Sequence, residues 1–390
     1  MNSIKKGSRE MAAWRALLTL PEAGRLPELL LLFFVSLLVI PFASVEAIAL
    51  IYLGLVSVFY YRLTARLSSL LLPALVGFLM YSLAGTLLLP AGFFAVTVGG
   101  AAGALLFALV AKWQYGVALA ALPSLAYLLA FLLSRDPLSA LLVLLPVSVA
   151  AVGGIAVRRL FTYKSAVLLI AASLGALLLT AGLITFLALG HGGANPLVTL
   201  ADTLREGIVA ATEEMRGMYA EMELPFPFST EEVVLLAALV VNLLPAIFVI
   251  CLLVTAYFAW RALLQMLLSF GVLPRLPLRL ALLDVSPYAA VLFMLAYLVS
   301  LIAGGGGDVV VGAVASNLAL ILEPALSLVG GKLLLHPGEE RSCLSFVLLI
   351  FTAYLLWTNP GVALVLLSFV GAIHILAVRI SAARKNKGER

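Results

Sequence analysis

The sequence VVLLAALVVNLLPAIFVICLLVTAYFAWR, residues 233–261, decides the fold class of this chain. It contains no charged side chain before Arg261. It is also longer than the roughly 20 apolar residues that an α-helix needs to cross the hydrocarbon core of a bilayer. Similar apolar runs recur along the rest of the chain. Together these runs predict an all-α fold, a polytopic α-helical membrane bundle.

The composition supports the same interpretation. Of the 390 residues, 64% are hydrophobic and 11% are charged, and the mean hydropathy is +1.18. A soluble domain carries about 25% charged residues, so this chain has too few charges to cover a water-facing surface. The net charge of +5 comes from basic residues grouped at the ends of apolar runs. Membrane topology explains this placement, and we expect no nucleic-acid partner.

We expect about twelve transmembrane helices, each near the length needed to cross a bilayer. The predicted spans are residues 29–44, 46–61, 69–89, 91–111, 115–134, 137–157, 165–189, 233–256, 285–303, 309–330, 343–357 and 361–378. With this division, all but three of the 24 Lys and Arg residues fall on one side, the exceptions being Arg135, Arg205 and Arg216. Cytoplasmic loops collect Lys and Arg, so both termini are predicted to be cytoplasmic.

The spans divide the chain into five predicted regions. Two of these regions are bundles, the first with about seven spans and the second with about five. These regions are a cytoplasmic N-terminal segment (1–28), an N-terminal transmembrane bundle (29–190), an extracytoplasmic acidic amphipathic helix (191–231), a C-terminal transmembrane bundle (232–380) and a basic cytoplasmic tail (381–390).

The long outer loop contains a helical pattern. Apolar residues recur at steps of three and four from Leu197 to Met222, and acidic residues occupy the opposite face. We expect one amphipathic helix that lies against the outer ends of the spans with its apolar side down. It could serve as a lid, as a gate over a ligand site or as a docking surface. Ser229 and Glu232 then predict a capping box that opens the next helix, which runs from Glu231 to about Phe270 with a kink at Pro245.

Small residues are frequent inside the spans. Gly99 and Gly103 form a G-x-x-x-G pair one helical turn apart. Small residues let helix backbones approach closely in a membrane. The pair predicts packing within the bundle or, alternatively, a homodimer seam.

Strongly polar side chains at membrane depth are few, and each is a candidate functional group because burying it in lipid is costly. The candidates are Asn242, Asn317, Glu323 and His374. We expect the spans at 233–256, 309–330 and 361–378 to enclose them in a partly polar, ligand-binding cavity.

A purely structural interpretation of the same residues stays open. Glu323 and His374 could satisfy each other, or Glu323 could pair with Lys332. Asn242 and Asn317 could serve as interhelical hydrogen-bond partners.

Motifs of enzymes and of cofactor sites are missing from the sequence. It contains no H-E-x-x-H, no G-x-S-x-G, no P-loop and no Asp-rich metal pair. We therefore expect no enzymatic activity, no cofactor and no metal site.

A family resemblance emerges in the second half of the chain. Leu243-Leu244-Pro245-Ala246 is followed by an aromatic and basic group, a Pro-rich link, an Asn-Leu pair and a late glycine, namely Tyr257, Ala259, Trp260, Arg261, Leu273 to Pro277, Asn317-Leu318 and Gly371. This order, with the acidic amphipathic segment ahead of it, resembles the YybS-like family of predicted bacterial membrane proteins. That family has no established activity. The resemblance implies a multi-pass protein of the bacterial cytoplasmic membrane.

The front half of that family resembles the S components of energy-coupling-factor transporters, which implies small-molecule uptake. This chain departs from S components, which have six spans and carry an A-x-x-x-A docking motif on the first span. Ala43 and Ala47 have that spacing here but lie at the outer exit of the first span.

Two functions follow as expectations. The first is a transport-related, small-molecule-binding membrane component. The alternative is a non-enzymatic membrane scaffold or regulator that binds a protein partner through the outer acidic helix. The lipid bilayer is a partner in both cases.

The charge distribution generates a topology prediction. A cysteine introduced at Thr212, in the outer loop, should react with a membrane-impermeant maleimide in intact cells, because that loop is predicted to face outside. A cysteine in the basic tail should react only after lysis. The reverse pattern would invert the topology.

Overall fold

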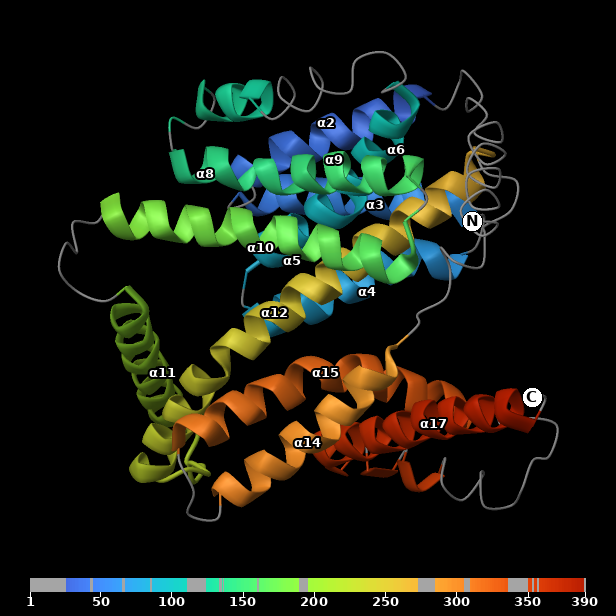
Figure 1. The fold of residues 1–390 in the computed structure, drawn as a ribbon. Coiled ribbons are helices and arrows are strands. Elements are labelled where there is room, and N and C mark those ends of the chain that lie inside the picture. Colours follow the sequence, from blue (N-terminus) through green and yellow to red (C-terminus); the bar gives the residue numbers. More distant parts are fainter. Residues whose placement is uncertain are drawn as a thin grey trace. The chain divides into compact units, whose positions relative to one another are not determined.

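A computed structural model describes residues 26–42, 45–64, 67–84, 86–110, 124–132, 135, 137–159, 161–188, 196–272, 285–304, 309–335, 350–352, 354–355 and 358–388. All regular secondary structure in these ranges is helical (Figure 1), which confirms the all-α fold. The chain forms two compact units. One contains residues 1–192 and 251–283, and the other contains residues 193–250 and 284–390. The predicted regions 29–190 and 232–380 differ from this division, because residues 251–283 group with the first unit.

Within the described residues, 7 helices are long and apolar enough to cross a membrane. They comprise residues 46–63, 88–109, 140–158, 163–184, 230–269, 310–334 and 361–381. Two shorter apolar helices cover 26–42 and 287–303. Residues 115–123 and 133–134 of one predicted span, residues 343–349 and part of 353–357 of another, and residues 1–25 and 190–195 lie outside the described residues. The count of twelve therefore stays a prediction.

The first unit contains most of the N-terminal helices. They are α2 (Leu26–Phe42), α3 (Glu46–Thr64), α4 (Leu67–Ala84), α5 (Leu88–Phe94), the π-helix η1 (Ala95–Gly99), α6 (Gly100–Val110), α8 (Pro137–Leu142), α9 (Leu144–Arg158), α10 (Tyr163–Ala188) and the second half of α12 (Thr230–Ser269). The run α5–η1–α6 is the most buried of the candidate spans.

Glycines make this burial possible. A Cβ atom on Gly99 would overlap the side chain of Ser36 on α2, and one on Gly103 would collide with the ring of Phe33. Without those Cβ atoms the helices approach closely, and the Ser36 hydroxyl forms a buried hydrogen bond of 2.7 Å with the hydroxyl of Tyr52 on α3. The G-x-x-x-G pair therefore packs within the chain, as the first alternative predicts.

The second unit contains α11 (Pro196–Glu221), the first half of α12, α14 (Pro287–Gly304), α15 (Val309–Leu335) and α17 (Pro360–Gly388). Helices α14, α15 and α17 pack together around Phe293, Leu326 and Phe369. The Phe369 ring lies 5.3 Å from the Phe293 ring and 5.1 Å from the Tyr297 ring, centroid to centroid. These edge-to-face contacts are a preferred geometry for aromatic pairs.

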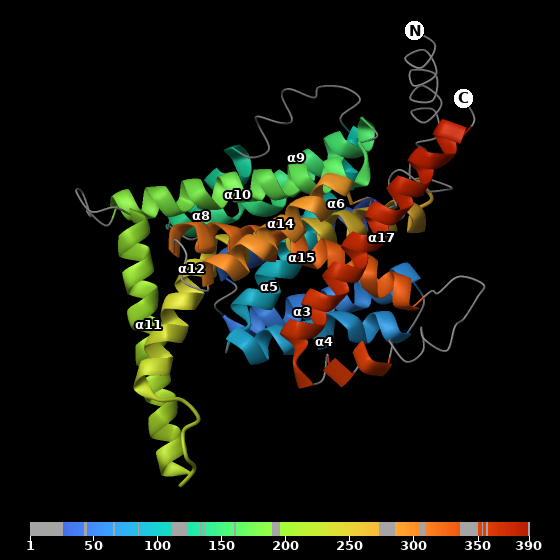
Figure 2. The ribbon, with the colours of Figure 1, turned by 60° about the horizontal axis from the view of Figure 1, so that its bottom comes forward.

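Helix α11 covers residues for which the sequence predicts an amphipathic helix, and it lies beside the start of α12 in both Figure 1 and Figure 2. Its extracytoplasmic position stays a prediction. The predicted apolar stripe is wrong in its second half, because Met215, Met218 and Met222 are exposed. The covered face instead runs in steps of four through Leu204, Ile208, Thr212 and Arg216. Since Thr212 is buried, the exposed Glu214 is the better position for the topology label.

The hydrogen bonds of Arg216 explain why this face of α11 is the covered one. Its guanidinium donates to the Glu213 carboxylate at 2.8 Å, to the Thr230 hydroxyl at 3.2 Å and to the Phe228 carbonyl at 3.4 Å. These bonds hold that face of α11 against the start of α12. The predicted capping box is confirmed there, since the Ser229 amide donates to the Glu232 carboxylate at 2.7 Å and the Glu232 amide donates to the Ser229 hydroxyl at 3.2 Å.

The closest backbone approach in the second unit joins α15 and α17. A Cβ atom on Gly330 would collide with the carbonyl oxygen of Leu367, and one on Gly371 would collide with the carbonyl oxygen of Leu326. Both obstacles are backbone atoms, which cannot rotate away.

Gly330→Ala should therefore destabilise the protein, by about 1–3 kcal/mol if it behaves as ordinary overpacking. The neighbouring Gly331 is the matched control, because a Cβ atom there meets no heavy atom within 4 Å. Thermal melting in detergent should show a lower transition temperature for Gly330→Ala and no loss for Gly331→Ala. Equal melting of the two variants would contradict the close approach.

Candidate functional site

Asn317 on α15 connects α15 to α12 through three hydrogen bonds. Its Nδ2 donates to the carbonyl of Asn242 at 2.8 Å and to the carbonyl of Ala313, on its own helix, at 2.8 Å. Its Oδ1 accepts the backbone N–H of Ala246 at 2.9 Å. A primary amide has two N–H groups and one carbonyl oxygen, so every polar atom of this side chain is used.

The position of this bridge on α12 follows from Pro245. A regular α-helix joins the carbonyl of Asn242 directly to the N–H of Ala246, four residues later. Pro245 has no N–H and its ring crowds the carbonyl of Val241, which disturbs the ladder at this point. The Asn317 amide supplies an acceptor and a donor to the same two backbone groups.

Asn242 participates through its backbone. Its side chain is exposed, whereas its carbonyl receives the Asn317 amide. The expectation that the Asn242 side chain lines a shared interior is therefore wrong. The expectation that Asn317 is an interhelical hydrogen-bond partner is confirmed.

Glu323 lies on α15 directly before Pro324 and is half-buried. Its backbone carbonyl accepts from the hydroxyl of Ser368 on α17 at 3.0 Å, a hydroxyl that also lies 2.8 Å from the carbonyl of Leu364. Ser368 is fully buried. The helix extends to Leu335, so Glu323 lies near the middle of the candidate span 310–334 and deeper than the predicted cytoplasmic third.

The structure does not bring Glu323 and His374 together. Helices α15 and α17 run in the same direction (Figures 1 and 2) and cross where Gly330 meets Gly371. Glu323 comes seven residues before that crossing and His374 three residues after it. At a rise of 1.5 Å per residue, their levels differ by about 15 Å.

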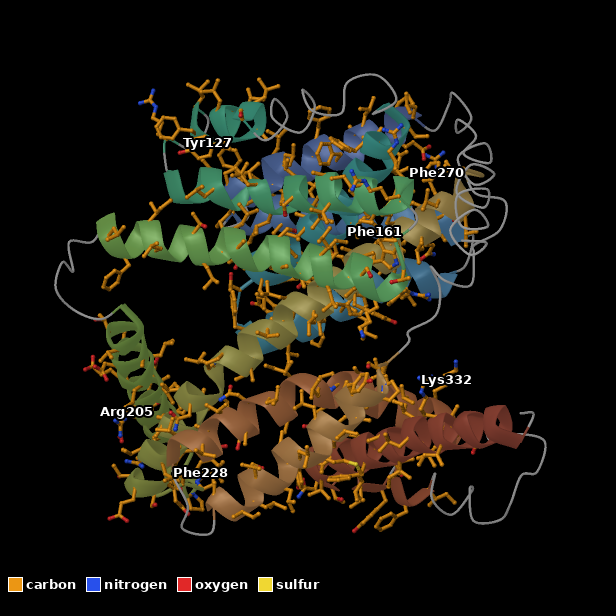
Figure 3. The ribbon with its side chains drawn as sticks, viewed as in Figure 1. Tyr127, Phe161, Arg205, Phe228, Phe270 and Lys332 are labelled. Carbon is orange, nitrogen blue, oxygen red and sulfur yellow. The ribbon has the colours of Figure 1, made fainter. Side chains whose placement is uncertain are left out.

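The ionisable candidates also have no ion-pair partner. In the part of the chain that the structure describes, neither Glu323 nor His374 lies within 4.0 Å of an opposite charge. Lys332 is exposed near the end of α15, away from the end at which α11 and Phe228 lie (Figure 3). The predicted pairings Glu323–His374 and Glu323–Lys332 are therefore both wrong.

An open apolar groove lies elsewhere in the unit, at the start of α12, and is lined by Phe228, Glu232, Leu235, Leu236 and Leu239. Among the described residues, no group of three or more His, Cys, Asp or Glu side chains could hold a metal ion. Of the four candidates, Asn317 and the backbone of Asn242 therefore form one hydrogen-bonded bridge, and Glu323 and His374 are two separate ionisable groups.

Sequence reasoning missed Ser368 and Arg216. A serine in an apolar run is a weak signal, because its hydroxyl can bond to its own helix. Arg216 carries a stronger signal, since a basic residue on the acidic outer side departs from the charge pattern of the chain.

Comparison of the chain with protein-family models, with curated proteins and with solved structures finds no match. The geometry of the chain itself must therefore support any functional conclusion.

Proposed function

We propose that this chain is a transport-related integral membrane component that binds a small molecule or ion in its second unit, with Glu323 as the ionisable binding group. The proposal places the chain in the cytoplasmic membrane of a bacterium, with both termini in the cytoplasm. It also relates the chain to the YybS-like family.

The observation that carries the proposal is the state of Glu323. It is a half-buried carboxyl group in the middle of an apolar helix, and no cation lies within ion-pair distance among the described residues. A carboxyl group at this depth is expensive and is a functional candidate by default. Its backbone is held by Ser368 and by the nearby glycine crossing, so the group has a fixed place.

The surrounding helices have features that transport proteins use. Both α12 and α15 contain an internal proline, Pro245 and Pro324. Each proline deprives the carbonyl four residues earlier of its usual donor. In secondary transporters, interrupted helices near the midplane offer such carbonyls to ions and substrates.

Glu323→Gln tests the proposal. Purified protein would be screened by thermal shift against a library of small molecules and inorganic cations. At least one compound should stabilise the natural protein and lose most of that effect with Glu323→Gln, while the unliganded melting temperature stays the same. Ser327→Ala, one turn further along α15, is the control because its hydroxyl bonds to the Pro324 carbonyl of its own helix.

Two outcomes would reject the proposal. In one, Glu323→Gln lowers the melting temperature and leaves ligand stabilisation intact, which would make Glu323 structural. In the other, no compound stabilises the natural protein.

The outer surface of α11 favours a second candidate function, a scaffold or regulator that binds a protein partner. Its exposed acidic residues are Asp202, Glu206, Glu213, Glu214 and Glu221, and exposed methionines lie among them. Methionine-rich surfaces suit adaptable protein contacts. In-cell cross-linking should then capture a partner whose yield falls with Glu206→Lys/Glu214→Lys and is unaffected by Glu323→Gln.

A further inference from the structure

The long helix α12 contains a proline, and a side chain of another helix bonds to its backbone beside that proline. It is a single helix of 40 residues with Pro245 inside it. Its first part belongs to the second compact unit and its last part to the first, with the change between Ile250 and Cys251. The disturbed step between Asn242 and Ala246 thus comes just before this change.

A side chain of another helix contacts this step. The Asn317 carboxamide bonds to both backbone groups of the step, its Nδ2 to the Asn242 carbonyl at 2.8 Å and its Oδ1 to the Ala246 N–H at 2.9 Å. Hydrocarbon offers no hydrogen bonds, so backbone groups beside a proline in a membrane helix gain from a protein partner. Because a side chain of α15 is that partner, we expect the conformation of α12 at Pro245 to depend on the position of α15.

We infer that residues 242–246 form a hinge in α12 and that Asn317 is its latch. In the latched state the carboxamide bridges Asn242 and Ala246 and holds one bend. When α15 withdraws Asn317, the second Nδ2 hydrogen bond, to the Ala313 carbonyl, keeps the amide partly satisfied on its own helix. The Asn242 carbonyl and the Ala246 N–H can then bond to water or directly to each other.

The inference goes beyond the proposed function and does not depend on it. Small net free energies per hydrogen bond make a two-bond latch reversible. Prolines are a usual cause of sharp kinks in helices. The latch assigns Asn317 a switching role, whereas the ligand-binding proposal concerns Glu323.

Hydrogen exchange of the full chain in detergent tests the latch. In Asn317→Leu, whose side chain has the same branching but forms no hydrogen bonds, the Ala246 amide should exchange about five- to tenfold faster, as the loss of one ordinary hydrogen bond implies. Pro245→Ala restores the donor and allows a regular ladder. Adding Asn317→Leu to Pro245→Ala should therefore change the exchange of Ala246 little. Ser327→Ala on the same helix should match the natural protein.

Electron spin distances along α12 test the hinge. Nitroxide labels at the exposed positions Leu235 and Val254 lie on either side of the step. Both natural cysteines are first replaced, as Cys251→Ser and Cys343→Ser. The distance distribution should be broader in Asn317→Leu than in the natural protein and narrower in Pro245→Ala.

Three results would overturn the inference. The first is an Asn317→Leu protein with unchanged Ala246 exchange. The second is an equal effect of Asn317→Leu with and without Pro245, which would make the bridge independent of the proline. If Asn317→Leu fails to fold, Pro245→Ala alone decides the question, because an unchanged distance distribution would show that residue 245 is no hinge.

Discussion

Satisfaction of backbone hydrogen bonds inside an apolar medium is the constraint on which the structure depends. Every N–H and C=O group at membrane depth must be paired within the protein, and a helix pairs nearly all of them without outside help. This requirement explains why all regular structure in the described ranges is helical. It also makes the few interruptions of helices the places where structure and function are most closely linked.

Three such interruptions are handled in different ways. Beside Pro245 a carboxamide from another helix bonds to the Asn242 carbonyl and to the Ala246 N–H. Beside Pro324 a buried serine hydroxyl bonds to the Glu323 carbonyl. At Ala95–Gly99 the chain widens into a π-helix in the most buried span, and π-helical turns are often found at functional positions. Interhelical polar contacts of the first two kinds are modest in energy, so they position helices more than they stabilise them.

Close packing supplies the remaining cohesion. The hydrophobic effect does not hold helices together in lipid, and packing must do so through shape. The glycines at 99, 103, 330 and 371 each lie where a Cβ atom would collide with a neighbouring helix. The exposed methionines of α11 and the leucines of the α12 groove show the opposite case, apolar side chains left open to lipid or to a partner.

The sequence by itself determined the fold class, the membrane location of the apolar helices, the length of α12 and the amphipathic helix, because these follow from local composition and periodicity. It also identified Asn317 and Glu323 as polar groups at depth, since a single polar residue in an apolar run is visible without a structure. Only the tertiary structure decided their partners. Glu323 and His374 are similar in apparent depth along the sequence, but the crossing at Gly330 and Gly371 separates their levels. Asn242 contributes a carbonyl in place of its side chain, since the Asn317 amide bonds to its backbone and its side chain is exposed. Such pairings depend on which faces of two helices meet and at what register, and no local pattern in one helix contains that information.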